Sequence, residues 1–418
     1  MLKQQKNFFD FLRFCIGSAK ETPDSLKEAD WKELYRIAQK QCLVGVLFDG
    51  IKKLPSEQLG MKKESLFQWM AECQMLEKAN VRLNDAAIQV SEWFRKKGFR
   101  TCILKGQGNA LMYPNPYSRT PGDIDIWVEG GYKRVISFVR SISPHEKACY
   151  HHIEFPSYKG VEVEVHYRPS FLLCFWHNRK LQEYYERVKE EQFSHRVMLG
   201  EQGEIAIPTT EFNLIFQLTH IYAHLMNEGI GLRQLLDYYY VLCDFYKVND
   251  ISKITPSLFT LKEGSTSHPD PLSSGAREKT ALRCSEPLRY KDGGPSKVSP
   301  NCAGWDRLGV LQKELKELRL WKFAGAIMYI MQEVFGMPAS RLIVPPNEKY
   351  GKFVLNEVLE AGNFGKHDER NCFGRSKLGH NLQRVYRDIR LVRYFPAEAM
   401  SEPFFRVWHF FWRLKYRR

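Results

Sequence analysis

The hydrophobic and polar positions of the chain follow a helical spacing at both ends and a different pattern in between. Apolar residues recur every three or four positions through residues 30–51 and 65–98, which predicts amphipathic helices with Gly98 as the stop. The N-terminal stretch MLKQQKNFFDFLRFCIGSAKE also predicts an amphipathic helix, because Asp10 and Arg13 interrupt an apolar run that a signal peptide would keep unbroken. Residues 1–97 are therefore expected to form an N-terminal helical region.

From residue 99 onward, short apolar runs alternate with helical ones. FRTCILKG predicts a strand that ends at Gly106, QGNALMY a brief helix, PNPYSRTPG a loop and DIDIWV a second strand. YKRVISFVRSI then predicts a helix, and KACYHHIEF, PSYKG and VEVEVHYRP predict a strand, a turn and a strand. Strands and helices in this order form an α/β core, which we expect over residues 98–207.

Helical spacing returns after Pro208 and predicts a C-terminal helical domain made of residues 208–251 and 305–418. The segment between them, residues 252–304, is rich in Pro, Ser and Gly and has little periodicity. This composition predicts a disordered insertion without a chemical role. The fold class predicted for the whole chain is α+β, with a small mixed sheet flanked by N-terminal and C-terminal helical regions.

Charge and cysteine content narrow the class of protein. The net charge of +14 suggests a polyanionic or phosphorylated partner, although solubility alone also explains it. The ten cysteines are scattered singly with no C-x-x-C pair, which indicates neither a zinc ribbon nor a disulfide framework and fits reduced thiols in a cytoplasm. The longest apolar run, WKFAGAIMYIMQEVFGM, contains Lys322, Gln332 and Glu333 and is too short and polar for a transmembrane helix.

Paired acidic residues carry the candidate chemistry. Asp123 and Asp125 are one residue apart, so a strand would place both carboxylates on one face, where they repel each other. Glu162, Glu164 and His166 share one face of a later strand. Carboxylates on adjacent strands predict a Mg²⁺ site, and two such ions about 3.5–4 Å apart stabilise an in-line phosphoryl displacement. Either Glu162 or Glu164 supplies the third carboxylate, and we prefer Glu164 because it lies closer to His166.

Residues before the aspartates indicate a phosphate-binding turn. Gly106, between a strand and a helix, lets the backbone approach a phosphate closely, and Lys105 adds a positive charge. Arg119 has the forked geometry that pairs with phosphate oxygens or holds an acidic side chain in place.

The run ILKGQGNALMYPNPYSRTPGDIDIWV, followed by VEVEVHYRP, resembles the catalytic core of the DNA polymerase β-like nucleotidyltransferase superfamily. More narrowly, it is similar to a bacterial family of uncharacterised nucleotidyltransferases. GIGLRQLLDYY and FPAEAMSEPFFRVWHFFWRL also resemble such proteins, so the resemblance covers most of the chain outside the insertion.

The resemblance implies a polymerase β-like fold and the transfer of an NMP group from an NTP, such as ATP, with release of pyrophosphate. It implies two Mg²⁺ ions held by Asp123, Asp125 and Glu164. The residues implied for nucleotide contact are Lys105, Gly106, Gly108 and Arg119.

The turn departs from the usual pattern, because Gln107 follows Gly106 and Asp123 comes 17 positions after that glycine. An alternative is therefore a catalytically silent module on the same fold that binds nucleotide or a partner protein. For an enzyme, we favour a small molecule or a protein side chain as the acceptor over nucleic acid.

Histidines and cysteines elsewhere have simpler interpretations. His220 and His224 have i, i+4 spacing, which favours packing or hydrogen bonding over metal binding without an H-E-x-x-H motif. Cys149, His151 and His152 are too close together in a strand-like run to predict a zinc site.

Two sets of charged residues also have two interpretations each. Arg233 and Asp237 have the spacing of an intrahelical ion pair, and the resemblance raises contact with the acceptor or the base as an alternative. The C-terminal FFRVWHFFWRLKYRR is expected to pack its aromatic residues on the helical body while its arginines face solvent. Arginines 384, 387, 390 and 393 fit either a stripe that binds nucleic acid or a solvated helix face.

Overall fold

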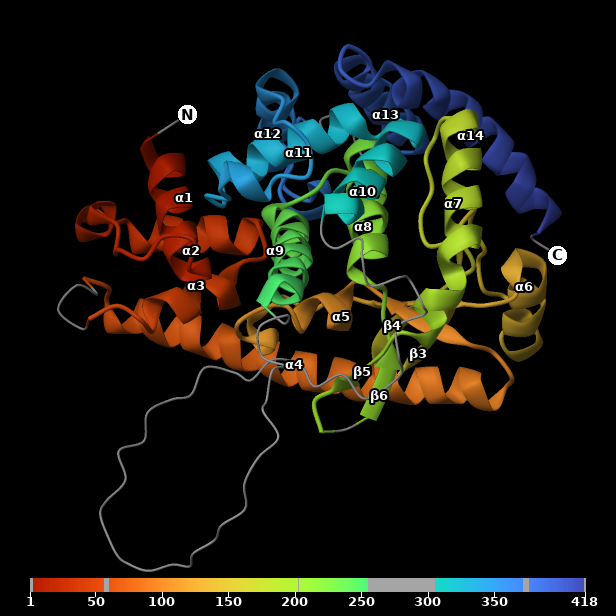
Figure 1. The fold of residues 1–418 in the computed structure, drawn as a ribbon, viewed down its shortest axis with the longest axis horizontal. Coiled ribbons are helices and arrows are strands. Elements are labelled where there is room, and N and C mark those ends of the chain that lie inside the picture. Colours follow the sequence, from red (N-terminus) through yellow and green to blue (C-terminus); the bar gives the residue numbers. More distant parts are fainter. Residues whose placement is uncertain (1–2, 56–59, 202, 255–304, 371–375, 417–418) are drawn as a thin grey trace, which may run out of the picture.

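The computed structural model describes residues 3–55, 60–201, 203–254, 305–370 and 376–416 (Figure 1). The N-terminal region is helical, as predicted. Its helices are α1 (Lys3–Ile16), η1 (Asp24–Glu28), α2 (Trp31–Lys40), α3 (Val44–Ile51) and the long α4 (Lys63–Lys96). Gly98 follows α4 with a φ of +80°, a left-handed conformation that favours glycine, so the predicted helix stop is confirmed.

A four-stranded sheet forms the centre of the molecule. Its elements are β1 (Thr101–Leu104), α5 (Gly106–Ala110), η3 (Pro116–Ser118), β2 (Ile124–Val128), α6 (Gly131–Ile142), β3 (His152–Tyr158) and β4 (Val161–His166). The strand order is β1-β2-β4-β3; β2 and β4 are parallel, and the other two pairs are antiparallel. The turn expected over PSYKG is wrong in extent, because β3 continues to Tyr158 and only Lys159 and Gly160 turn, both with positive φ.

Alternation along the strands gives the sheet two different faces. Ile124, Ile126 and Val128 point to the face that packs against α4 and α6, in a core shared with Phe94 and Val139. Trp127 belongs to a second, larger core on the opposite face, formed with helices from both ends of the chain. Asp125 lies on the same side of β2 as Trp127, so the acidic residues face these helices and not α4.

After the sheet the chain adds one helix and a small hairpin that the sequence did not reveal: α7 (Phe175–Ser194), β5 (Arg196–Leu199) and β6 (Gly203–Ala206). The predicted C-terminal helices follow as α8 (Thr210–Asn227), α9 (Leu232–Ile254), α10 (Trp305–Glu317), α11 (Trp321–Glu333), η5 (Ala339–Arg341), α12 (Glu348–Ala361), η6 (Asn363–Gly365), α13 (Lys377–Val392) and α14 (Pro396–Lys415). The predicted insertion over 252–304 lies almost entirely outside the described residues.

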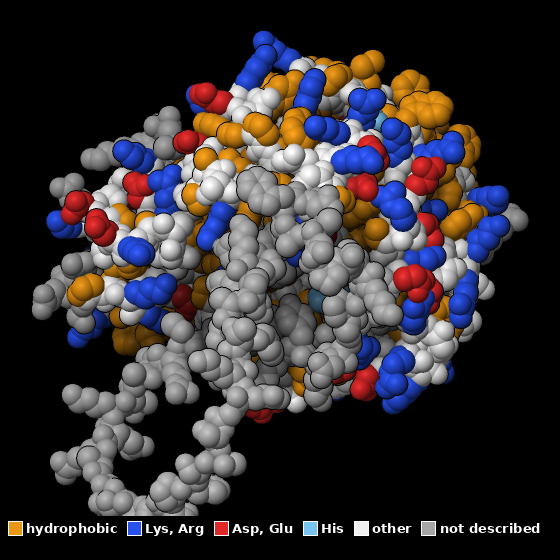
Figure 2. Space-filling view, in the orientation of Figure 1, with side chains coloured by type: hydrophobic (Ala, Val, Ile, Leu, Met, Phe, Trp, Pro, Cys, Tyr) orange, Lys and Arg blue, Asp and Glu red, His pale blue; other side chains and the backbone are white. Residues whose placement is uncertain are grey.

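The last helix differs from expectation. Phe405 is buried, and Trp412 packs against the core that the sheet shares with α4 and α6. Phe404, however, is 71% exposed and Phe411 is 63% exposed. Figure 2 shows hydrophobic side chains gathered with Lys and Arg over the region of α13 and α14, at the upper right. The expectation that the aromatic residues of this segment pack on the helical body is therefore wrong for Phe404 and Phe411. These two lie on the side of α14 that does not contact the body.

The predicted fold class is confirmed: helices surround a small mixed sheet, and the architecture is α+β. Within the described residues, none of the helices combines the length and the apolar composition that crossing a membrane requires. The division into an N-terminal region (1–97), a core (98–207) and a C-terminal domain stays a prediction.

Candidate active site

Strand register brings the predicted carboxylates together. On the parallel strands β2 and β4, Asp125 is paired with Glu164, so their side chains lie next to each other on one face of the sheet. Asp123 immediately precedes β2, and one carboxylate oxygen from each of the three residues lies within 4.8 Å of the others. Glu162, two residues before Glu164 on β4, is exposed to solvent. Of the two candidates, Glu164 is therefore the one that joins the aspartates.

Two basic side chains lie against these carboxylates. Lys105 Nζ is 2.9 Å from Asp125 Oδ2, and His166 Nε2 is 2.9 Å from Asp125 Oδ1 and 3.3 Å from Glu164 Oε2. Burial alone would raise the pKa of Asp125, but Lys105 and His166 outweigh it and hold that pKa well below its usual range. Burial would lower the pKa of His166, yet its hydrogen bonds to Asp125 and Glu164 raise it to about 9.

The repulsion between the carboxylates shows most clearly in the pKa of Asp123. The charge of Asp125 and, after it, burial raise the pKa of Asp123 to about 6, against the opposing effect of Lys105. Hard oxygen ligands in such a group suit a cation such as Mg²⁺, which would relieve this repulsion. The donor set therefore fits a divalent metal.

The turn at Lys105 and Gly106 has an unusual backbone. Lys105 has φ +55° and ψ −137°, and Gly106 has φ +39°, so both residues adopt conformations that ordinary side chains rarely take. Such strain persists only where surrounding structure holds it. Here the following helix, α5, is fixed to α8 by buried amides: Asn213 Nδ2 donates to Asn109 Oδ1 (3.0 Å), and Gln217 Nε2 donates to the same oxygen (3.1 Å).

Gly108 has a packing role in the structure, and its expected contact with nucleotide stays a prediction. A Cβ at this position would lie 3.1 Å from Ile207 Cγ2, so the missing side chain allows α5 to pack closely on the residue that follows β6. Gly108 lines neither of the cavities described below.

Arg119 takes the second of its two expected roles. Its Nε donates to Asp237 Oδ1 and its Nη2 to Asp237 Oδ2, both at 2.8 Å, and both side chains are buried. Tyr113 Oη also donates to Asp237 Oδ1, at 2.7 Å. The expected intrahelical pair of Arg233 with Asp237 is therefore wrong, because the Asp237 carboxylate is bound by Arg119 from the loop before β2.

Arg233 lies beside the carboxylates instead. Its Nη1 donates to the Thr120 carbonyl oxygen (3.2 Å), its Nε has no acceptor among the described residues, and burial lowers the pKa of the guanidinium. It lines a small, narrow cavity of about 40 Å³ together with Lys105, Gly106 and Asp123. Sequence spacing alone did not predict that Arg233 lies beside the carboxylates, because its place depends on how α9 packs against the loop before β2.

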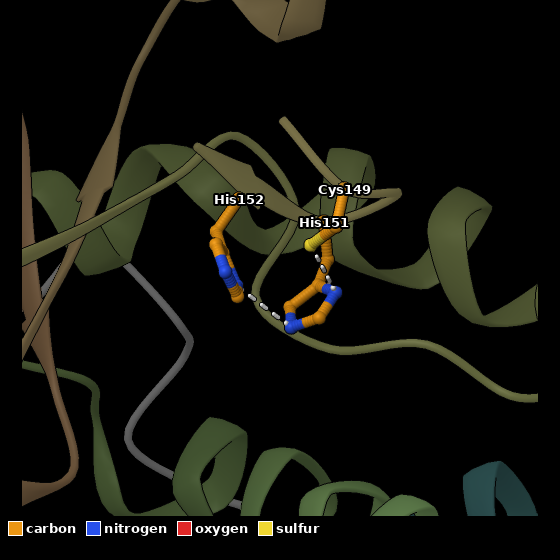
Figure 3. Close-up of side chains that lie close together, drawn as sticks. All are labelled: Cys149, His151 and His152. Atoms are coloured by element: carbon orange, nitrogen blue, oxygen red, sulfur yellow. Dashed lines mark hydrogen bonds between the residues drawn. The ribbon is translucent and has the colours of Figure 1, made fainter. Parts of the chain in front are cut away.

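A row of histidines continues from the carboxylates across the sheet. His152 is paired with His166 on the antiparallel strands β3 and β4, and its Nδ1 is 3.2 Å from Glu164 Oε2. Figure 3 shows His151 between Cys149 and His152, with Nδ1 3.5 Å from Cys149 Sγ and Nε2 3.0 Å from His152 Nδ1. The sequence interpretation set these residues aside, and what it lacked was the register that brings them to Glu164.

His220 and His224 on α8 line the same site as the carboxylates. His220 Nε2 is 3.1 Å from Lys105 Nζ, and His224 Nδ1 is 3.5 Å from Glu228. Burial and the nearby Lys105 hold the pKa of His220 well below its usual value, so it is neutral and accepts a hydrogen bond from Lys105. The expected hydrogen-bonding role is confirmed for this pair.

A larger cavity of about 530 Å³ opens beside the carboxylates. Its walls include Asp123, Asp125 and Glu164 on one side and Arg384, Phe405 and His409 from α13 and α14 on the other. This volume lies in the range typical of small-molecule sites.

The family model described as uncharacterised nucleotidyltransferase matches residues 27–258, more than half of the chain. The chain belongs to this family. No curated protein and no solved structure matches it. Membership supports nucleotidyl transfer as the general activity, with the NTP and divalent metal that such enzymes generally use. The matched residues include the sheet, the carboxylates and α8, whereas α13 and α14, which close the larger cavity, lie outside the match.

Proposed function

We propose that this protein is a metal-dependent nucleotidyltransferase that moves an NMP group from an NTP to a small molecule or a protein side chain and releases pyrophosphate. The observation that carries the proposal is the register of β2 and β4, which gathers Asp123, Asp125 and Glu164 beside a strained Lys105-Gly106 turn.

Asp123, Asp125 and Glu164 would hold the divalent metal, which we take to be two Mg²⁺ ions as in related enzymes. When bound, the metal supplies charge neutralisation for the triphosphate and the reacting oxygens. Lys105 and His166 balance the charge of Asp125 and Glu164 in their present arrangement, and this keeps the buried carboxylates ionised.

Lys105 and Arg233 are the cations placed to bind the donor triphosphate. Both line the narrow cavity beside Asp123, and Arg233 has no carboxylate pair of its own among the described ion pairs. Gly106 would let a phosphate approach the backbone closely. The space beside its Cα is open, since a Cβ there would lie 3.9 Å from the Asp123 carbonyl oxygen. Arg119 acts indirectly by fixing the loop before β2 to α9 through Asp237. Catalysis in such a site is mainly positioning and electrostatic stabilisation.

The larger cavity is the proposed acceptor site. It touches Asp123, Asp125 and Glu164 and is enclosed on the other side by α14, so it suits a small molecule or a side chain that enters from solvent. A nucleic acid duplex would need an open groove lined by unpaired arginines, but Arg387 and Arg390 are engaged by neighbouring elements.

Calorimetric titration with Mg²⁺ and each NTP tests the nucleotide site. We expect binding by the unmodified protein, a loss of at least tenfold in affinity with Asp123→Asn/Asp125→Asn, and no change with the matched control Glu162→Gln. Equal binding by the double variant and the unmodified protein would contradict the proposed site.

A further inference from the structure

His152, Glu164 and His166 form a group with its own chemistry. Their ligand atoms all lie within 4.8 Å of one another: His152 Nδ1 is 3.2 Å from Glu164 Oε2, and His166 Nε2 is 3.3 Å from the same oxygen. The group shares Glu164 with the three carboxylates, but its other two ligands are imidazoles.

The distances suit a tetrahedral metal. Zinc binds His nitrogen and carboxylate oxygen at about 2.0–2.2 Å, which places neighbouring ligand atoms of a tetrahedron about 3.3–3.5 Å apart. The two separations from Glu164 Oε2, 3.2 and 3.3 Å, are close to that edge. His152 Nδ1 would exchange its present contact with His151 Nε2, at 3.0 Å, for the ion. Imidazole nitrogen favours Zn²⁺ and similar transition metals over Mg²⁺, which prefers oxygen.

The secondary structure holds these side chains in place. His152 and His166 are directly paired between β3 and β4, and Glu164 lies two residues before His166 on the same face of β4. His166 Nδ1 is 3.3 Å from the Arg168 carbonyl oxygen, to which it can donate, while Nε2 faces Glu164 Oε2 and Asp125 Oδ1 and would release its proton on binding a metal. This matches the way metal-ligating histidines are oriented in proteins, by a hydrogen bond from the second ring nitrogen.

The neighbouring Cys149, His151 and His152 form a competing group with a softer ligand. In this group His151 lies between the other two, with one ring nitrogen directed at Cys149 and the other at His152 (Figure 3). An ion bound by Cys149 and His152 together would have to reach across that imidazole ring. The geometry therefore favours the group that contains Glu164.

We propose that His152, Glu164 and His166 form a binding site for Zn²⁺ or a similar transition metal, adjacent to the carboxylate group and sharing Glu164 with it. All three residues line the larger cavity, so the fourth ligand would be a water or substrate oxygen from that cavity or Asp125 Oδ1, which lies 2.9 Å from His166 Nε2. This site does not depend on the proposed transfer reaction, because two of its three ligands lie outside the carboxylate group.

Zinc titration of the full chain against a colorimetric zinc chelator tests the site. His152→Ala and His166→Ala are each expected to weaken binding by at least the roughly 10–100-fold that loss of a supporting residue costs. Three controls are expected to retain binding: His145→Ala, which removes an exposed histidine; Asp123→Asn, which alters only the carboxylate group; and Cys149→Ser.

Cobalt provides a spectroscopic readout without activity. Co²⁺ bound to the unmodified protein is expected to give visible absorption of a four- or five-coordinate site without a thiolate charge-transfer band, and His166→Ala should remove that absorption. A thiolate band, or loss of zinc binding in Cys149→Ser but not in His166→Ala, would overturn the proposal in favour of the cysteine group. Unchanged binding in both histidine variants would also overturn it. Failure of nucleotide binding alone would leave this site intact and count only against the proposed function.

Discussion

Arg119 and Asp237 join the loop before β2 to α9 through two parallel hydrogen bonds of 2.8 Å, with both side chains less than a tenth exposed. The pair fixes the position of the chain just before Asp123. Removing one partner of a buried ion pair leaves an uncompensated charge, which costs about 3–5 kcal/mol.

Arg119→Ala is therefore expected to lower the free energy of unfolding by about that amount, measured by urea denaturation. Arg179→Ala is the matched control, because its pair with Glu183 is exposed and should contribute little. Similar small losses in both variants would show that the Arg119 pair does not hold the loop.

Arg233 is predicted to bind the donor and not to stabilise the fold. Burial without a carboxylate of its own lowers its pKa, so Arg233→Gln removes a poorly compensated charge and should leave stability unchanged or higher. The same variant should weaken binding of Mg·NTP by about 10–100-fold, the value of a hydrogen bond to a charged group. Thermal unfolding and calorimetry on one preparation measure both effects. A loss of stability with unchanged nucleotide affinity would assign Arg233 a structural role.

The sequence predicted the local elements of the site better than the contacts between them. Alternation was enough to predict that Asp125 and Glu164 lie on strands with their side chains on one face, because side-chain direction along a strand has a period of two. Asp123, expected on the same strand as Asp125, lies immediately before β2. The choice of Glu164 over Glu162 depends on the β2–β4 register, which local sequence does not specify.

Long-range partners account for the errors. Spacing of four residues suggested that Arg233 pairs with Asp237, but a bidentate partner from a loop more than a hundred positions earlier in the chain is the stronger one. The cluster around His152 was missed for a similar reason, since β3 pairing and not sequence distance brings it to Glu164. In the C-terminal helix, the aromatic content gave no indication of which face contacts the body.

The arginines of α13 are predicted to serve packing and not nucleic acid. Arg387 donates to the carbonyl oxygens of Asn227 and Glu228 at the end of α8, and Arg390 Nη2 donates to Glu357 Oε2 at 3.0 Å. Arg387→Ala should lower the free energy of unfolding by about 1.5–3 kcal/mol, the value of hydrogen bonds to a charged group. The exposed Arg393 is the control and should have no such effect.

A gel shift with single-stranded and duplex RNA at near-physiological salt completes this test. We expect no sub-micromolar binding by the unmodified protein. Tight binding that is lost in both Arg387→Ala and Arg393→Ala would contradict the preference for a small molecule or a protein side chain as acceptor.

Transfer of label from NTPs carrying ³²P at the α-phosphate tests the central claim most directly. The protein is incubated with Mg²⁺, each labelled NTP and either a metabolite extract or total cell protein, and both pyrophosphate and labelled product are measured. We predict that pyrophosphate and a labelled acceptor appear together, that Asp125→Asn and Glu164→Gln abolish both, and that Glu162→Gln leaves both unchanged. Nucleotide that binds tightly without pyrophosphate or label transfer in any extract, or transfer that survives Asp125→Asn, would contradict the account.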